Sequence, residues 1–413
     1  MAIKRYIFSD LVDHLKKEEI SLIVGPRQAG KTTLMLQLQD YLKEKKKTTL
    51  FLSLDFEGDM PHFLSQKALM DRTRLDLGRK KGYVFIDEIQ RKENAGIFLK
   101  GIYDMQTPYK FIVSGSGSLE LKEKVHESLA GRKRMFELNT VSLKEFANYR
   151  TGYKYEDRLA DYFRINKAEG MSLLMEYLNF GGYPKVILEE TLEEKLKIMD
   201  EIYRSYIEKD VAYLLRVERI DAFGNLIRLL AGQIGKIINL NELSSTLGIS
   251  IPTVKNYLVY AEKTFIVKRV TPYFRNIRTE ISKSPVIYFN DIGMRNFAMR
   301  HFGRYAMLHE MGFIFQNLIY HLLYEKTRYD GSTIHFWRTK DKAEVDFVMN
   351  RGDEVIPIEV KCKELKDKTI ARSLRSFIAK YNPKEAWVVN IGFKDEETIG
   401  DTRVKFIPYF ELI

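Results

Sequence analysis

The sequence predicts an α/β protein in which a parallel sheet comes first and a second, mixed α/β part comes last. Over the first 150 residues, short apolar runs alternate with helical patterns, as in parallel sheets whose strands are joined by helices. Near the C-terminus, the helical stretch MGFIFQNLIYHLLYEK precedes strand-like runs that carry polar residues. Between these parts lies a segment rich in helical spacing, which predicts a helical connection.

Composition bounds the protein's class. The 413 residues suffice for two to four domains of about 100 to 200 residues each. A formal charge of +11 favours an anionic partner such as nucleic acid, although 30% charged residues of both signs also suit a solvated surface. Cys362 is the single cysteine, so no internal disulfide can form and a reducing compartment is expected. We find no signal-peptide core and no apolar run near 20 residues, and therefore expect a cytoplasmic protein without a membrane partner.

A phosphate-binding loop is the strongest motif in the chain. The apolar run from Ile20 to Val24 predicts a buried strand, and a helical pattern follows the motif G-x-x-x-x-G-K-[ST]. We expect Lys31 to reach the β- and γ-phosphates and the Thr32 hydroxyl to bind Mg²⁺. Backbone N–H groups of the loop would surround the phosphates. The predicted nucleotide-binding residues of this loop are Gly25, Pro26, Arg27, Gln28, Ala29, Gly30, Lys31, Thr32 and Thr33.

Acidic and polar residues end two further strand-like runs. The run YVFIDEIQ reaches Asp87 and Glu88, which we expect at the carboxyl edge of the sheet, where ligands bind. Asp87 would hold the Mg²⁺ shell and Glu88 would polarise the attacking water. Ser114 ends the run KFIVS and could sense the γ-phosphate. Arg132 precedes another strand-like run; it is either part of a basic turn or an arginine finger that acts across a subunit boundary, which would require a homo-oligomer.

These motifs carry a family resemblance. The stretches GPRQAGKTTL, VFIDEIQ, SGSGS, LAGRKRMFELNTVSLKEF and FGGYPKV resemble, in this order, the prokaryotic AAA-type ATPases that have a C-terminal domain of unknown function. The resemblance implies ATP as ligand, a five-stranded parallel sheet with the P-loop strand central, and a helical lid. In related switch ATPases a glycine–proline motif of the lid touches the adenine, so Pro184 is a candidate contact. The same residues could also be a break between two helices.

The middle of the chain has the pattern of a winged helix-turn-helix. A short helix is expected to end near Gly248, Ser250 can cap the next helix, and Pro252 fits its first turn; a β-like run follows. Basic residues outnumber acidic ones there, which suits a phosphate backbone, although such modules also pack against their own chain. The predicted contacts to DNA, double-stranded or branched, are Lys255, Lys263, Arg269 and Arg275.

The C-terminal part is similar to the PD-(D/E)xK nuclease fold. Glu359 and Lys361 are two apart on one strand-like run and therefore share a face, while Asp346 lies on the preceding run. The resemblance implies that Asp346 and Glu359 hold Mg²⁺ and that Lys361 orients a water or neutralises charge. Relatives commonly carry glutamate where this chain has Gln316, which would weaken metal binding and puts hydrolysis in doubt.

The predicted domains are a P-loop AAA-type ATPase core (1–150), a helical lid (151–235), a winged helix-turn-helix (236–283) and a PD-(D/E)xK nuclease-like α/β domain (284–413). The expected function is an ATP-hydrolysing switch or motor acting on nucleic acid. Two alternatives stay open: a nucleotide-controlled protein-binding scaffold with an inactive nuclease fold, and an ATP-gated metal-dependent endonuclease.

Overall fold

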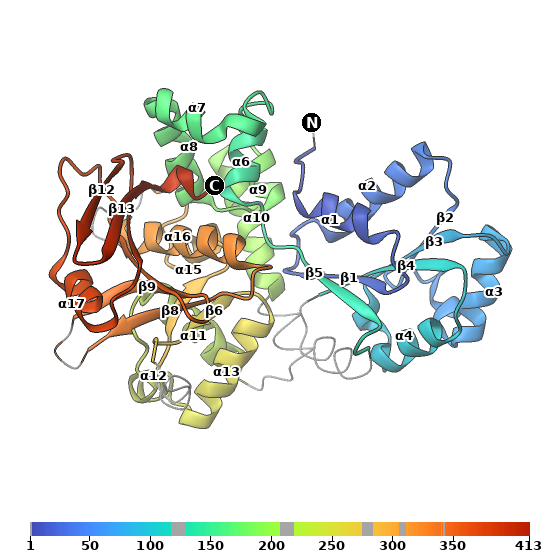
Figure 1. The fold of residues 1–413 in the computed structure, drawn as a ribbon. Helices are drawn as coiled ribbons and strands as arrows, with labels where there is room; N and C mark the ends of the chain where they lie inside the picture. The colour runs from blue at the N-terminus through green and yellow to red at the C-terminus, as the bar shows by residue number, and fades with distance from the viewer. Residues whose placement is uncertain are drawn as a thin grey trace.

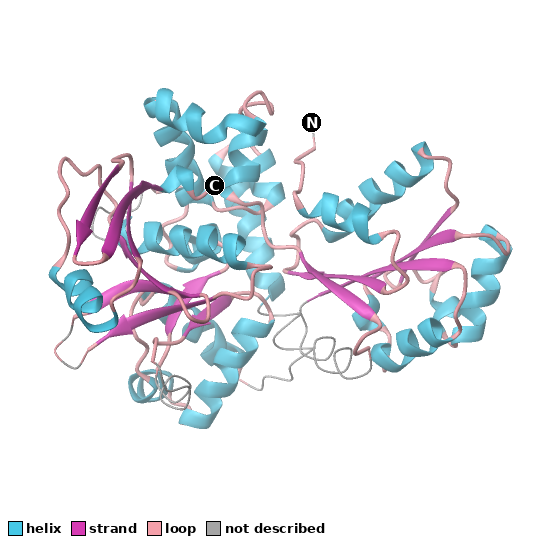
Figure 2. Cartoon of the chain, in the orientation of Figure 1, coloured by secondary structure: helices cyan, strands magenta, loops and turns pink. Residues whose placement is uncertain are grey.

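Two sheets lie at opposite ends of the molecule, with helices between them (Figure 1). The computed structural model describes residues 2–116, 129–206, 219–274, 284–304, 311–339, 341 and 343–413. Helices cover both faces of each sheet (Figure 2). Among the described helices, none is both long enough and apolar enough to cross a membrane.

The N-terminal sheet has five parallel strands in the order β2-β3-β4-β1-β5. The P-loop strand β1 is therefore second from the edge and β4 is central, which corrects the expectation of a central P-loop strand. Helices α1 and α2 pack on one face, and α3 and α4 on the other. The elements are α1 (Ile7–His14), β1 (Ile20–Gly25), α2 (Lys31–Glu44), β2 (Thr49–Ser53), η1 (Met60–Phe63), α3 (Gln66–Leu77), β3 (Gly82–Asp87), η2 (Ile89–Arg91), α4 (Ala95–Asp104), β4 (Tyr109–Ser116) and β5 (Lys133–Glu137).

A helical part follows the first sheet. It begins with a capping box, in which Ser142 Oγ accepts from the backbone N–H of Glu145 and the Glu145 carboxylate accepts from the Ser142 N–H. Pro184 occupies the first turn of its helix, where its missing N–H has no helical partner to lose. The helices are α6 (Leu143–Arg150), η3 (Glu156–Arg158), α7 (Leu159–Ile165), α8 (Lys167–Phe180), α9 (Pro184–Leu188) and α10 (Leu192–Ser205).

The described residues of the middle part form four helices and a two-stranded antiparallel pair. As the sequence predicts, Gly248 ends one helix in the left-handed conformation (φ +60°), and Ser250 caps the next by accepting from the Thr253 N–H at 3.2 Å. The paired strand β7 lies beyond residue 283, where the winged helix was predicted to end. The elements are α11 (Ile220–Gly232), α12 (Leu240–Leu247), α13 (Ile251–Lys263), β6 (Val267–Val270), β7 (Val286–Phe289) and α15 (Ile292–Ala298).

The C-terminal sheet is mixed, with six strands in the order β12-β13-β11-β10-β9-β8. Strand β11 runs parallel to β10 and β13, and the other pairs are antiparallel. Helix α16 packs on one face and α17 on the other. The elements are α16 (Met311–Thr327), β8 (Thr333–Arg338), β9 (Glu344–Asn350), β10 (Val355–Val360), α17 (Arg372–Tyr381), β11 (Glu385–Asn390), β12 (Asp395–Ile399), β13 (Thr402–Pro408) and η5 (Tyr409–Glu411).

The buried core is divided unequally between these parts. The N-terminal sheet has its own apolar layer on each face. By contrast, one continuous cluster joins the helical, middle and C-terminal parts, with Phe146, Phe223, Phe289 and Phe315 among its members. The parts after β5 therefore share a core, and Phe265 of the middle part also packs into one apolar layer of the first sheet.

Candidate functional site

Two glycines shape the loop between β1 and α2. A Cβ at Gly25 would lie 2.0 Å from the carbonyl oxygen of Leu138, so only glycine fits this close approach. Gly30 has φ +95° and begins helix α2 from the left-handed conformation. The buried Lys31 folds back over the loop, and its Nζ donates to the carbonyls of Gly25 (3.1 Å) and Pro26 (2.8 Å). The ammonium group is thus held against the turn that the motif predicts for phosphate binding.

Asp87, Thr32 and Ser114 meet at the carboxyl edge of the sheet. The strand order places the ends of β3 and β4 beside the loop that follows β1. Thr32 Oγ1 donates to Asp87 Oδ2 at 2.7 Å, and the Ser114 hydroxyl donates to the other carboxylate oxygen. The backbone N–H of Glu88 donates to Asp87 Oδ1 and to Ser114 Oγ, both at 3.2 Å. Residues far apart in the sequence therefore form one polar cluster.

Glu88 combines an unusual backbone conformation with a raised side-chain pKa. Its backbone is left-handed (φ +58°), a conformation that non-glycine residues rarely adopt and that is common at functional sites. Burial raises the pKa of its carboxyl, and the nearby charge of Lys31 opposes that rise. The Gln90 side-chain amide donates to Glu88 Oε2 and orients the carboxylate. Sequence analysis did not single out Gln90, although it follows in the same DEIQ stretch.

A cavity of about 550 Å³ joins the loop to the helical part. The predicted Pro184 lies on its wall, and the pyrrolidine Cγ is 3.9 Å from the position of a Cβ on Gly30. The cavity brings together these predicted residues: Arg27, Gln28, Ala29, Gly30, Lys31, Thr32, Thr33, Glu88 and Pro184. It also contains residues that the sequence did not indicate: Ala2, Ile3, Arg5, Leu34, Gln37, Lys185, Leu188 and Ser205.

Arg132 lies outside this cavity. Residue 133 pairs with Ile20 at the start of β1, so Arg132 sits at the amino edge of the sheet, across the length of the strands from the loop. Its Nε donates to Asp104 Oδ1 at 2.8 Å. Within its own chain Arg132 is remote from the P-loop, which leaves the basic-turn role or a role in a neighbouring subunit.

A second polar cluster lies on β9, β10 and α16. Gln316 Nε2 donates to Asp346 Oδ1 at 2.9 Å, and the backbone N–H of Val360 donates to Oδ2 at 2.7 Å. Lys361 Nζ donates to Glu359 Oε1 at 2.6 Å, as expected for side chains two apart on a strand. Strand β9 has a bulge opposite Phe336, where Asp346 and Phe347 together face this one residue of β8. The structure thus brings the four predicted residues together.

This cluster is short of positive charge. Burial, and secondly the charge of Glu359, raise the pKa of the Asp346 carboxyl to about 7. Glu359 is 7% exposed, and its buried Oε2 has no hydrogen-bond partner among the described residues. The two carboxylates could hold a divalent cation through oxygen, with Gln316 as a neutral neighbour. The described residues contain no group of three or more His, Cys, Asp or Glu side chains placed to hold a metal, so such a cation would need further oxygen ligands from water or substrate.

The predicted nucleic-acid residues are dispersed. Lys255 is exposed on α13, and Lys263 at the end of that helix is half-buried. Arg269 is exposed on β6 but pairs with Glu262, its Nη2 at 2.5 Å from Oε2. Arg275 lies outside the described residues. The structure therefore presents Lys255 as the most accessible of the described three.

Comparisons with known proteins divide the chain into three matched regions. Residues 17–147 match the model of an AAA domain, 171–304 match a domain of unknown function (DUF8612), and 311–412 match another (DUF4143).

Three relatives match most of the chain. An uncharacterized protein of Methanocaldococcus jannaschii is 26% identical over 90% of this chain and 81% of its own length. Uncharacterized proteins of Mycobacterium tuberculosis (26%; 88% of this chain, 74% of that protein) and Haemophilus influenzae (23%; 85% and 84%) are also similar.

Among solved structures, a signal transduction ATPase with numerous domains from Pyrococcus horikoshii is similar at a TM-score of 0.29 and 12% identity, over 79% of this chain and 46% of that one. A replication initiator DnaA bound to AMPPCP and single-stranded DNA has a TM-score of 0.29 and 16% identity, over 62% of this chain and 86% of that one. The domain match and the five-stranded parallel sheet agree: the N-terminal part of this chain is similar to AAA domains that carry a P-loop.

Proposed function

We propose that the protein binds and hydrolyses ATP and uses the cycle to act as a switch or motor on nucleic acid. The observation that carries the proposal is a polar cluster at the carboxyl edge of the sheet, beside the P-loop. Its members are Lys31, Thr32, Asp87, Glu88 and Ser114. It combines a cation for phosphates, oxygen ligands, and the half-buried carboxylate of Glu88 beside them. These are the parts that phosphoryl transfer to water requires.

Each residue has a defined role in this proposal. Lys31 exchanges the two loop carbonyls for phosphate oxygens, and loop N–H groups bind the same phosphates at the start of α2. Thr32 and Asp87 fit a Mg²⁺ ion, because their oxygens already lie 2.7 Å apart and are the hard ligands that this ion prefers. The ion would neutralise phosphate charge. Glu88, with its raised pKa, takes a proton from the attacking water. Pro184 contacts the adenine ring of the nucleotide.

The action on nucleic acid rests on charge and on α12–α13. The formal charge is +11, and Lys255 projects from α13 into solvent. The proposal includes a winged helix that contacts DNA through Lys255, Lys263, Arg269 and Arg275. It also includes a following domain that packs like a PD-(D/E)xK nuclease. So are a cytoplasmic location, to which the half-buried single cysteine Cys362 is suited, and a homo-oligomer in which Arg132 faces a neighbour.

One observation favours a second activity at the C-terminal sheet. The orphan Glu359 Oε2 beside Asp346 suits a divalent cation, which metal-dependent endonucleases use to activate water. With Gln316 in place of a third carboxylate, we propose a site that binds metal weakly and cuts little. An inactive nuclease-like fold would leave the alternative of a nucleotide-controlled scaffold.

The test is the rate of ATP hydrolysis with and without single- and double-stranded DNA. The proposal expects basal hydrolysis that DNA stimulates severalfold. Hydrolysis that DNA leaves unchanged would favour the scaffold, and no nucleotide binding at all would contradict the proposal. Cleavage of plasmid or branched DNA in Mg²⁺ or Mn²⁺, abolished in Asp346→Ala, would establish the endonuclease.

A further inference from the structure

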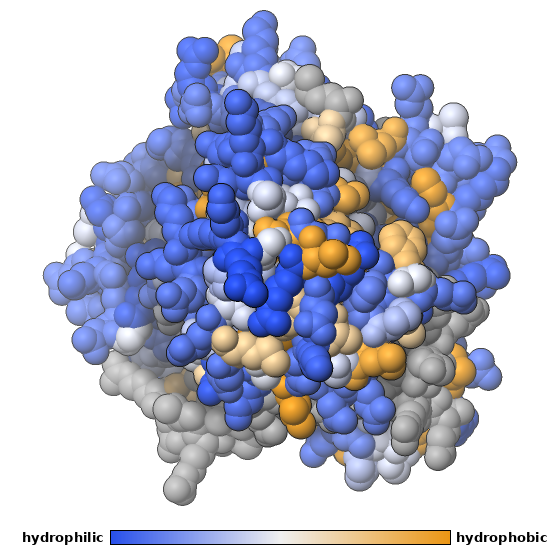
Figure 3. All heavy atoms as spheres, turned by 90° about the vertical axis from the view of Figure 1, so that its right-hand side faces the viewer, coloured by the Kyte–Doolittle hydropathy of each residue, from blue (hydrophilic) through white to orange (hydrophobic). Residues whose placement is uncertain are grey.

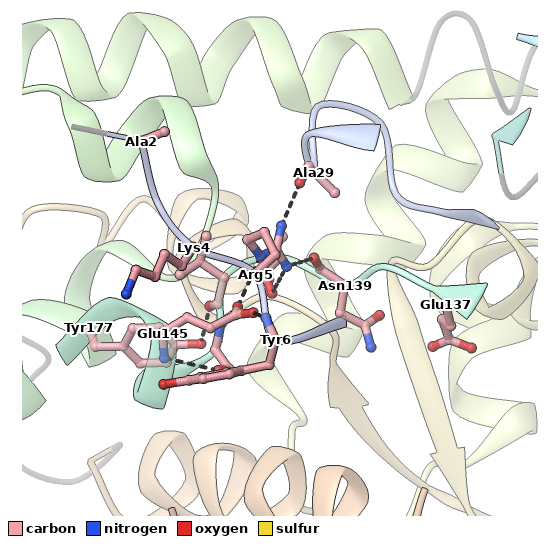
Figure 4. A network of polar contacts seen from close by, with 12 residues as sticks. Ala2, Lys4, Arg5, Tyr6, Ala29, Glu137, Asn139, Glu145 and Tyr177 are labelled. Atoms are coloured by element: carbon pink, nitrogen blue, oxygen red, sulfur yellow. Dashed lines mark hydrogen bonds and ion pairs between the residues drawn. The ribbon is translucent and has the colours of Figure 1, made fainter. Parts of the chain in front are cut away.

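The N-terminal segment passes between the P-loop and the start of the helical part, and Arg5 bonds to both (Figure 4). The guanidinium donates through Nη1 to the carbonyl of Ala29 (2.9 Å). Through Nη2 it donates to the carbonyls of Asn139 (2.7 Å) and Thr140 (3.3 Å). Its Nε donates to Glu145 Oε2 (3.1 Å), and both charged side chains are less than a tenth exposed. A planar guanidinium with this many acceptors has one orientation.

Glu145 anchors the far end of this contact. Its Oε1 accepts from the backbone N–H of Tyr6 (2.8 Å), and its Oε2 accepts from Ser142 in the capping box of α6. The carboxylate is therefore fixed by backbone groups of two segments, independently of Arg5. A buried carboxylate held in this way gives Arg5 a rigid support.

The bond to Ala29 fixes a phosphate-binding group. The peptide between Ala29 and Gly30 is planar and trans, so the Gly30 N–H points opposite to the Ala29 carbonyl. Because Arg5 holds that carbonyl, it also sets the direction of the Gly30 N–H on the cavity wall. Gly30 has φ +95°, a region where glycine has much freedom, and without Arg5 this peptide could rotate.

We propose that Arg5 is a positioning residue for the nucleotide: it locks the Ala29–Gly30 peptide so that its N–H faces the phosphates. The proposal rests on the proposed ATP-binding function. It also links the P-loop to the strand exit, because Asn139 and Thr140 follow β5, whose last residue Glu137 accepts from Lys268 and Tyr324 (both 3.3 Å). The hydrogen bonds of Arg5 thus connect the P-loop to the segment after β5. That segment leads into the core that the helical, middle and C-terminal parts share.

The experiment compares three variants of the full chain. Arg5→Lys keeps a cation beside Glu145 but lacks the fork that reaches Ala29 at the same time. Glu145→Gln removes the ion pair and leaves the Ala29 contact available. Lys4→Ala is the matched control, because Lys4 is the neighbouring residue and pairs with Glu156 at the surface. For each variant we would measure the Kd of a fluorescent ATP analogue, KM and kcat for ATP, and the urea midpoint of unfolding.

We expect Arg5→Lys to weaken ATP binding and raise KM about tenfold, the size of one hydrogen bond to a charged group, while kcat stays within about threefold and the urea midpoint falls by no more than it does in Glu145→Gln. Glu145→Gln should lower the urea midpoint with a smaller change in Kd, and Lys4→Ala should change neither. A structural role alone predicts that Kd follows the urea midpoint across the variants. That pattern, or parental ATP affinity in Arg5→Lys, would overturn the inference and leave the proposed function standing. A parent protein that binds no nucleotide would overturn both.

Discussion

The two polar clusters of this protein differ in how their carboxylates are satisfied. At the P-loop, Asp87 accepts from Thr32, Ser114 and the N–H of Glu88, so both of its oxygens have donors. On the C-terminal sheet, the pKa of Asp346 is raised to about 7 and Glu359 leaves one buried oxygen without a described donor. The carboxylate of Asp87 in the first cluster is fully hydrogen-bonded, whereas a proton or a cation would stabilise the carboxylates of the second.

This difference explains why the two sites should respond to different tests. Changes at the P-loop cluster should alter ATP kinetics and leave stability nearly unchanged. Changes at the C-terminal cluster should alter stability, pH dependence and metal response even if no catalysis occurs there.

The largest expected effect concerns Arg132. If it completes a neighbour's site, Arg132→Ala should lower kcat for ATP about a thousandfold, because arginine fingers contribute about 10³ or more. Loss of its surface ion pair with Asp104 should cost under about 1 kcal/mol of stability. Mixing Arg132→Ala with Lys31→Ala should restore some hydrolysis through hybrid interfaces.

Asp104→Ala is the matched control, since it removes the ion pair and keeps the arginine. If Asp104→Ala and Arg132→Ala behave alike, Arg132 belongs to a structural turn. Mixtures of confirmed oligomers that stay inactive would also exclude a role in trans.

A smaller effect should separate the clusters by pH. The folded-state pKa of Asp346 is raised above its unfolded value of 3.8, so the folded state binds more protons between these values and stability falls as pH rises from about 4 through 7. We expect the contribution of this group to the free energy of unfolding to fall by about 2 to 4 kcal/mol as the pH rises, at about 1.4 kcal/mol for each unit of pKa shift. Urea unfolding at pH 5 and pH 8 measures it.

Asp346→Asn should remove most of that pH dependence. Mn²⁺ should stabilise the parent more at pH 8 than at pH 5, because the cation competes with the proton for the same carboxylates. A parent whose stability is equal at both pH values, or an Asn variant that keeps the parental slope, would contradict the account of this cluster.

The next effect concerns Gln316. Gln316→Glu replaces the donor to Asp346 with a third carboxylate, and it should destabilise the metal-free protein by about 1 to 3 kcal/mol. Mn²⁺ should restore the stability, and metal-dependent cleavage of branched DNA should rise. Adding Asp346→Ala should abolish that gain. If neither Gln316 form cuts DNA, the domain keeps its fold for binding alone.

The smallest effect concerns the proposed DNA contacts on α13 and β6. Lys255→Ala with Arg269→Ala should weaken DNA binding and lower the salt slope by about 0.9 for each phosphate that the variant no longer neutralises. The Arg269 change should matter less, because that side chain already pairs with Glu262. Lys43→Ala with Lys45→Ala, on the exposed end of α2, gives the same change in net charge as a control. Equal slopes for both double variants would move the DNA surface elsewhere.

Local patterns explain which parts were predictable from the sequence. The P-loop follows from glycine geometry and spacing over eight residues, and the caps at Gly248 and Ser250 follow from neighbouring residues. The position of β1 in the sheet was predicted wrongly, because strand order depends on long-range packing. Arg5 was missed for the same reason, since its contact to Glu145 spans 140 residues. The Glu359 oxygen that has no partner among the described residues depends on how separate elements pack, which no local pattern of residues predicts.

The exposed surface of the first domain carries large apolar side chains among hydrophilic ones. Hydrophilic residues predominate on the face shown in Figure 3, with small groups of hydrophobic ones between them. Exposed large apolar side chains of this domain include Phe56, Leu64, Leu75 and Ile97, on separate elements. Single apolar residues of this kind are normal on soluble domains.

The most direct test of the central claim is ATP binding and hydrolysis measured together for Lys31→Ala and Glu88→Gln, with exposed Glu93→Gln as control. Lys31→Ala should weaken ATP binding about a hundredfold, because the loop loses its cation. Glu88→Gln should bind ATP within about threefold of the parent while hydrolysis falls about a hundredfold or more, because the base is removed and the binding groups remain. Glu93→Gln should match the parent. Parental turnover by Glu88→Gln would show that Glu88 does not activate the water and would contradict the account of this site.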